Sequence, residues 1–184
     1  MPDYPSKRLF IALPLDEVAI ADLRDAMSGV GIEGLRLTRP ENLHVTLKFL
    51  GDVDDPLIAD LIVALKDVAA GHRPFDLAMT GVTYLPDARR ARVLAAAMDR
   101  PAAALTLFEQ VEQAAYELGF PREGRPYRPH ITVGRFRRPP RSVPPPDSFR
   151  LAPTTVPVTR LVLVHSTLGA EAPVYTELAD FPLG

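Results

Sequence analysis

Two of the four histidines in this chain occupy the same position of a nonapeptide that occurs nearly twice. Residues 39–47 are RPENLHVTL and residues 125–133 are RPYRPHITV. In each copy Arg-Pro is followed by three residues, a histidine, one residue, a threonine and an apolar residue, and the copies are 86 residues apart. Because imidazole can give or take a proton near neutral pH, the matched residues His44 and His130 predict acid–base chemistry.

Each of these histidines belongs to a His-x-Thr motif. Side chains two residues apart on a strand point to the same face, so His44 lies beside Thr46 and His130 beside Thr132. If the two strands are neighbours, two imidazoles and two hydroxyls converge on one cleft. A neutral and a protonated histidine can then act as general base and general acid, while hydroxyls donate to phosphate oxygens. The set suits the opening of a phosphodiester without a metal, although a single His-x-Thr is more often structural.

Several other chemistries are excluded by what the sequence lacks. The chain contains no cysteine, which rules out disulfides, thiolate metal sites and a cysteine nucleophile. His-x-Thr has no metal-ligand spacing, and neither a Gly-x-Ser-x-Gly elbow nor a phosphate-binding glycine loop is present. We therefore expect no metal and no cofactor.

Positive charge is concentrated around the second motif. Residues 122–141 contain seven arginines against the single acid Glu123, and guanidinium groups suit phosphate oxygens. A solvated basic loop is the alternative interpretation of this window. Near the first motif, strand alternation places Lys48 on the same face as His44, which makes it a candidate additional cation.

Apolar spacing and capping residues predict about three helices and seven or eight strands. The helices are expected from Asp16 to about Val30, from Asp55 to Gly71 and over residues 101–118. The strands are expected at 8–14, within an extended segment 35–51 that Gly51 closes, at 75–82, at 92–98, around His130, and near 156–165 and 173–179. This order predicts an α+β domain with a mostly antiparallel sheet.

Length and composition are those of an ordinary globular protein. The 184 residues suffice for one domain over 1–184, built as a compact pair of half-sized lobes. Hydrophobic residues make up 47% and charged residues 24%, a usual balance for such domains. No stretch approaches the roughly 18 apolar residues of a membrane helix, so we expect a cytoplasmic monomer that does not bind membranes.

The motifs HVTL and HITV, at this separation in a chain of this size, resemble those of the 2H phosphoesterase superfamily. More closely, the segments RLFIALPL, NLHVTLKFLG, PHITVGR and YTELADFPL are similar to the bacterial and archaeal RNA 2′,3′-cyclic phosphodiesterases, once called 2′-5′ RNA ligases. The resemblance implies a two-lobed α+β fold with pseudo-twofold symmetry, helices packed outside, and an active cleft between the lobes. It also implies RNA termini or nucleoside 2′,3′-cyclic phosphates as substrates.

The implied reaction opens a 2′,3′-cyclic phosphate to a 2′-phosphate, with O3′ leaving and no metal. Carried over from the family, His44 is the proton donor to O3′, and His130 is the proton acceptor that activates water. Thr46 and Thr132 match the phosphate-binding hydroxyls, and Arg135 matches the phosphate-facing arginine. The alternatives are 2′-5′ ligation as the main activity of the same site, or a non-catalytic module that binds RNA ends.

Strict strand alternation conflicts with the role implied for Arg135. Alternation groups Arg135 with Ile131 and Val133 on the core side of the strand, away from His130. A bulge at Gly134 would turn the arginine back toward the histidine. Without such a bulge, another member of the cluster such as Arg128 would have to take its place.

Further candidates surround the two motifs. Phe10 and Tyr127 could stack on a base at the RNA end, with core packing as the alternative for each. His165 lies in a strand-like run and His72 follows the end of a helix, and we expect a structural role for both.

Overall fold

The protein is described by a computed structural model over residues 4–28, 31–169 and 172–184. Within these ranges nine strands form one antiparallel sheet in the order β7-β4-β5-β6-β3-β1-β8-β9, with β2 paired to β6. The strands are β1 (Ser6–Pro14), β2 (Leu35–Leu37), β3 (His44–Asp54), β4 (Phe75–Leu85), β5 (Val93–Met98), β6 (His130–Phe136), β7 (Thr155–Val158), β8 (Arg160–Thr167) and β9 (Val174–Pro182). The helices are α1 (Glu17–Met27), α2 (Asp55–Ala70) and α3 (Ala102–Glu117), and short 3₁₀ turns cover Pro40–Asn42, Ala88–Arg90 and Pro146–Ser148. The expected α+β class with a mostly antiparallel sheet is confirmed.

The three expected helices are all present, and local signals account for their ends. The Asp16 carboxylate accepts a hydrogen bond from the Ala19 amide at 2.9 Å, which caps α1. Proline stands in the first turn of α2, where its missing N–H costs nothing. Helix α1 ends at Met27, before the expected Val30, and residues 29–30 lie outside the described part of the chain.

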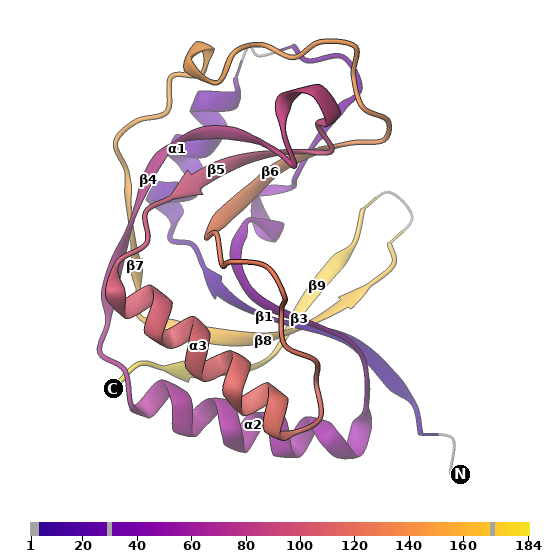
Figure 1. Cartoon of the computed structure of the whole chain (residues 1–184), viewed down its shortest axis with the longest axis vertical. Helices are drawn as coiled ribbons and strands as arrows, with labels where there is room; N and C mark the ends of the chain where they lie inside the picture. The colour runs from indigo at the N-terminus through magenta and orange to yellow at the C-terminus, as the bar shows by residue number, and fades with distance from the viewer. Residues whose placement is uncertain (1–3, 29–30, 170–171) are drawn as a thin grey trace.

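The helices cover different parts of the sheet. Figure 1 shows α2 and α3 side by side at the end of the molecule where β1, β3 and β8 pass, and α1 toward the opposite end. Most of the buried apolar side chains form one cluster that runs under both parts. Its largest fully buried members are Leu9, Ile11, Leu13, Leu23, Leu61, Leu65, Leu77, Leu94, Leu107, Ile131, Leu161 and Leu163. The central strands therefore pack against one continuous hydrophobic core.

Two expectations about the strands were wrong in detail. Gly51 does not close an extended segment, because β3 continues to Asp54, and Gly51 sits at a bulge opposite Leu9 with φ of 76°. The expected strand near 156–165 is two strands, since β7 pairs with β4 and β8 pairs with β1 and β9 at the other end of the sheet. Apolar alternation carries no information about such a change of partner.

The strands that carry the repeated motifs are neighbours in the middle of the sheet. β3 and β6 run antiparallel, and Val45 lies opposite Ile131. In this register the histidine of each motif lies across from the threonine of the other. Beyond this point the strands take different partners, because β3 continues along β1 while β6 continues along β5 and β2. The two strands are therefore paired only at the two motifs, in the middle of the sheet.

Candidate active site

The two His-x-Thr motifs open into one pocket of about 290 Å³. Five of the residues predicted from the sequence line it, namely both histidines, both threonines and Arg135. The complete lining is Arg36, Leu37, Thr38, Arg39, Asn42, His44, Thr46, Phe49, His130, Thr132, Arg135, Phe136, Arg137, Ala172, Pro173 and Tyr175. None of these lining residues is acidic, so the walls carry only positive side-chain charge.

Both histidines are held by the same backbone contact. The Nδ1 atom of His44 lies 2.8 Å from the carbonyl oxygen of Asn42, and Nδ1 of His130 lies 2.8 Å from the carbonyl oxygen of Arg128. A carbonyl oxygen only accepts, so Nδ1 carries the proton in each ring and Nε2 is the nitrogen left for chemistry. In His44 this Nε2 lies 3.0 Å from the hydroxyl oxygen of Thr46.

Burial distinguishes the first histidine. Desolvation lowers the pKa of His44, and the positive charges of Arg135 and His130 lower it further, against the raising effect of the Asn42 carbonyl. Burial disfavours the charged imidazolium because the surroundings solvate it less well than water does. His44 therefore gives up its proton more readily than a solvent-exposed histidine would.

Aromatic rings supply that burial. The ring of Phe10 lies 4.8 Å from the His44 ring, and the ring of Tyr175 meets His44 edge-on at 5.5 Å, measured between centroids. Phe10 is only 3% exposed and packs with Ala12, Val162 and other apolar groups. Core packing is thus the role that the structure gives Phe10, and its ring is not available to stack on a base.

A bulge at Gly134 turns Arg135 into the pocket. The pairing of β5 with β6 shifts between Leu94, opposite Gly134, and Ala95, opposite Thr132. One residue of β6 is therefore unpaired, the alternation is displaced by one position, and Arg135 becomes exposed on the wall that holds His130. The bulge expected at Gly134 is confirmed.

The same bulge occurs on β3, where it contradicts the role expected for Lys48. The pairing of β1 with β3 shifts between Ile11, opposite Lys48, and Ala12, opposite Thr46. Lys48 consequently points into the interior, where its Nζ donates to the Glu112 carboxylate at 2.6 Å. Phe49 takes the exposed position instead and lines the pocket. Regular alternation fails here because it does not take the extra residue into account.

Tyr127 and Arg128 do not line the pocket. The Tyr127 ring stacks on Phe108 of α3 at 4.1 Å, and its hydroxyl donates to the carbonyl of Thr46 at 3.3 Å. Burial raises the pKa of Tyr127. The alternative of core packing therefore holds for Tyr127, and Arg128 contributes its backbone carbonyl, not its guanidinium, to the site.

The remaining two histidines lie away from the pocket. His72 is buried at the end of α2, and its Nε2 lies 2.9 Å from the Gln110 side-chain oxygen on α3. His165 lies on β8 opposite Leu9. Both positions agree with the structural roles expected for these side chains.

Eleven of the sixteen lining residues were not predicted from the sequence, and these include three arginines and a tyrosine. Arg36, Arg39 and Arg137 add positive charge to its wall, and Tyr175 adds an aromatic ring from the distant strand β9. Arg39 begins the first nonapeptide, which offered a signal, and Arg137 belongs to the basic window. Nothing local marked Arg36 or Tyr175. Among the described residues, no group of three histidine, cysteine or acidic side chains could hold a metal ion.

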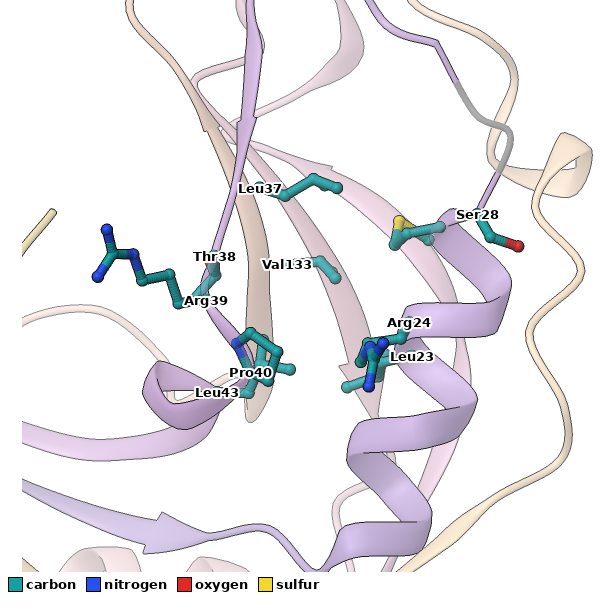
Figure 2. A pocket seen from close by; sticks show the side chains of 10 residues that line it. Leu23, Arg24, Ser28, Leu37, Thr38, Arg39, Pro40, Leu43 and Val133 are labelled. Atoms are coloured by element: carbon teal, nitrogen blue, oxygen red, sulfur yellow. The ribbon is translucent and has the colours of Figure 1, made fainter. Parts of the chain in front are cut away.

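A second cavity of about 380 Å³ lies beside the first, between α1 and the segment that includes β2. Figure 2 shows Leu23 and Arg24 of α1 on one side of it and Leu37, Leu43 and Val133 on the other. The segment 37–39 lines both cavities. This second lining is mostly apolar and includes no histidine and no acidic residue, so it offers no acid–base pair.

Comparison with known proteins agrees with this geometry. The model of the LigT-like phosphoesterase family matches residues 13–95 and 98–175. An RNA 2′,3′-cyclic phosphodiesterase of Methanothermobacter thermautotrophicus is 28% identical over 96% of this chain and 98% of its own. One of Thermus thermophilus is 32% identical over 96% of this chain and 90% of its own.

The fold has similar solved structures. The crystal structure of TT0787 of Thermus thermophilus matches with a TM-score of 0.86 and 32% identity, covering 96% of this chain and 97% of that chain.

Across the described residues, the helices are too short or too polar to cross a membrane.

Proposed function

Because this chain belongs to the LigT-like phosphoesterase family, we propose that it hydrolyses 2′,3′-cyclic phosphates at RNA ends to 2′-phosphates. One observation carries the proposal above the others. Two imidazoles with the same fixed tautomer present Nε2 to one pocket, from strands that lie side by side. The names of the relatives from Methanothermobacter and Thermus support the same reaction.

The proton transfers follow from the two Nε2 atoms. The unprotonated Nε2 of His130 takes a proton from a water molecule, whose oxygen attacks phosphorus. The P–O3′ bond breaks, and the protonated Nε2 of His44 gives its proton to O3′, which leaves as a hydroxyl. The lowered pKa makes the His44 imidazolium give up its proton more readily than an ordinary histidine does, and it also reduces the fraction of His44 that is protonated near neutral pH. Atoms and charge balance without a further reactant.

The remaining groups of the pocket bind the phosphate. Thr46 and Thr132 donate hydrogen bonds to the non-bridging oxygens, and Arg135 balances the negative charge that develops as water adds. The Thr46 hydroxyl already lies against His44, so it rotates toward the phosphate when substrate enters. A divalent metal is not required, because the histidines move the protons and the arginine neutralises the charge.

The two sides of the pocket suggest how a nucleotide lies in it. Phe49 of β3 and Tyr175, whose ring meets that of His44, provide aromatic surface on the side of His44, and Arg36 and Arg135 lie on the paired strands β2 and β6 on the side of His130. Stacking on an aromatic ring accepts any base, because every base has a π-face. The base is therefore placed toward Phe49 and the phosphate toward Arg135.

The test is hydrolysis of adenosine 2′,3′-cyclic phosphate in the presence of EDTA, with the product identified by ³¹P NMR. We expect turnover in EDTA and adenosine 2′-phosphate as the product. A 3′-phosphate product would reverse the leaving-group assignment. Activity lost in EDTA and restored by a divalent ion would contradict metal-independent catalysis. Binding without turnover would leave only the alternative of an RNA-end binder.

A further inference from the structure

Three arginines stand together on one wall of the pocket without an acidic partner. Arg36 of β2 lies directly opposite Arg135 of β6, and Arg137 follows two residues later. All three are exposed and line the pocket. In the part of the chain that the structure describes, none of them forms an ion pair.

This arrangement works against folding. Like charges directly opposite each other on antiparallel strands repel and destabilise the pair. Three arginines elsewhere in the described part of the chain do pair with acids, since Arg90 contacts Asp87 at 3.0 Å, Arg125 contacts Glu123 at 3.1 Å and Arg160 contacts Glu177 at 2.7 Å. The unneutralised pair in the pocket is therefore better explained by an anionic ligand than by stability.

The positive charge also exceeds what the reacting group needs. A 2′,3′-cyclic phosphate carries one negative charge, and Arg135 with the two threonines is sufficient to hold it. Arg36 and Arg137 are therefore left over on the wall of the pocket.

We propose that Arg36 and Arg137 bind a second phosphate, the one on the 5′ side of the terminal nucleotide. The proposal rests on the proposed function, since the cyclic phosphate must occupy the space between the histidines. The rest of an RNA chain leaves the terminal nucleotide through its 5′ oxygen, so the next phosphate lies beyond the reacting one. The pocket is thus matched to an oligonucleotide end more than to a free nucleoside cyclic phosphate.

The experiment compares kcat/KM for three substrates with the same terminal base. These are adenosine 2′,3′-cyclic phosphate, its 5′-phosphorylated form, and the dinucleotide ApA ending in a 2′,3′-cyclic phosphate. We expect at least a tenfold gain from the 5′ phosphate, whether it belongs to a chain or is terminal. Each additional phosphate contact should also steepen the plot of log(kcat/KM) against log[salt] by about 0.7.

Variants separate the subsite from general charge. In Arg36→Gln/Arg137→Gln the ratio of kcat/KM between the dinucleotide and the nucleoside substrate should fall toward one, and the two salt slopes should become equal. Arg122→Gln is the matched control, because residue 122 corresponds to Arg36 in the 86-residue offset but lies over the ring of Tyr116 at 4.8 Å. That control should keep the wild-type ratio.

The outcomes distinguish this inference from the proposed function. Equal kcat/KM for all three substrates would overturn the inference while hydrolysis stands. A gain restricted to ApA and insensitive to salt would assign it to the second base and overturn the phosphate subsite. If no substrate is hydrolysed, the proposed function fails. The phosphate subsite is then tested by measuring ligand affinities with titration calorimetry. Equal affinity for adenosine 2′-phosphate and its 5′-phosphorylated form would then overturn it.

Discussion

Strands β3 and β6 have the same backbone features around their histidines but different neighbouring side chains. Each has a His-x-Thr motif, a histidine Nδ1 held by the carbonyl two residues before it, and a bulge just after the threonine. The bulge turns the fifth residue after the histidine into the pocket, and this residue is Phe49 on one strand and Arg135 on the other. The duplicated backbone places the two histidines in matching positions, and the residues around each histidine differ between the two halves.

The residue that follows the unpaired position of each bulge, Lys48 or Gly134, shows where the difference arises. Lys48 reaches α3 and pairs with Glu112, whose second oxygen accepts from the Glu123 amide at 2.9 Å. Gly134 has β2 against it, and a Cβ there would lie 2.8 Å from Leu35 Cδ1. The lysine position needs a long side chain to reach a helix, and the glycine position needs no side chain because a strand lies against it.

Loss of either histidine should have the largest effect on activity. His44→Ala and His130→Ala should each lower kcat by about 10²–10⁴-fold, the usual contribution of a positioned acid or base. A phosphodiester with a nitrophenolate leaving group needs no proton at the leaving oxygen, so it should restore activity to His44→Ala far more than to His130→Ala. His165→Ala is the control and should stay within a few-fold. Equal rescue of the two variants would mean that their roles are not divided as proposed.

Breaking the ion pair under the β3 bulge should strongly affect stability. Lys48→Met leaves the Glu112 carboxylate buried without its cation, which should lower the free energy of unfolding by about 3–5 kcal/mol. Urea denaturation measures the change, and Lys66→Met on exposed α2 surface should stay within about 0.5 kcal/mol. An unchanged midpoint in Lys48→Met would show that the pair does not hold this bulge.

Phe49 and Arg135 occupy equivalent positions on the two strands, and replacing each of them should affect a different kinetic constant. Phe49→Ala removes a stacking surface worth about 1–3 kcal/mol per base, so KM should rise while kcat changes little. Arg135→Gln removes charge that is needed most in the transition state, so kcat should fall. Steady-state kinetics on adenosine 2′,3′-cyclic phosphate tests both. If both variants changed only KM, the division into a base side and a phosphate side would be wrong.

The pH profile should show the smallest effect and reveals the coupling between the halves. A protonated acid and a neutral base give a bell whose limbs belong to the pair. The positive charge of Arg135 lowers the pKa of His44, so Arg135→Gln should raise that pKa and move the limb that reports His44 to higher pH. Arg125→Gln, which removes charge paired with Glu123 outside the pocket, should leave the limb in place. A limb that moves to lower pH in Arg135→Gln would contradict the lowering of the His44 pKa by Arg135.

The sequence by itself determined the features that depend on neighbours along the chain. The repeated nonapeptide identified both histidines and both threonines, because side chains two apart share a face of any strand. Caps and apolar spacing identified three helices to within a few residues. Gly134 also suggested its own bulge, since a glycine within a strand often marks one.

Tertiary structure alone decided which of these features meet and what surrounds them. The pairing of β3 with β6, the burial of Lys48 against Glu112 and the exposure of Phe49 all depend on partners far away in the chain. The bulge just after Thr46 has no glycine to indicate it, so alternation placed Lys48 on the wrong face. Arg36 reaches the pocket because β2 pairs with β6 across about a hundred residues, as the register of Arg36 with Arg135 shows. Such contacts arise from the packing of whole elements, to which local sequence patterns are insensitive.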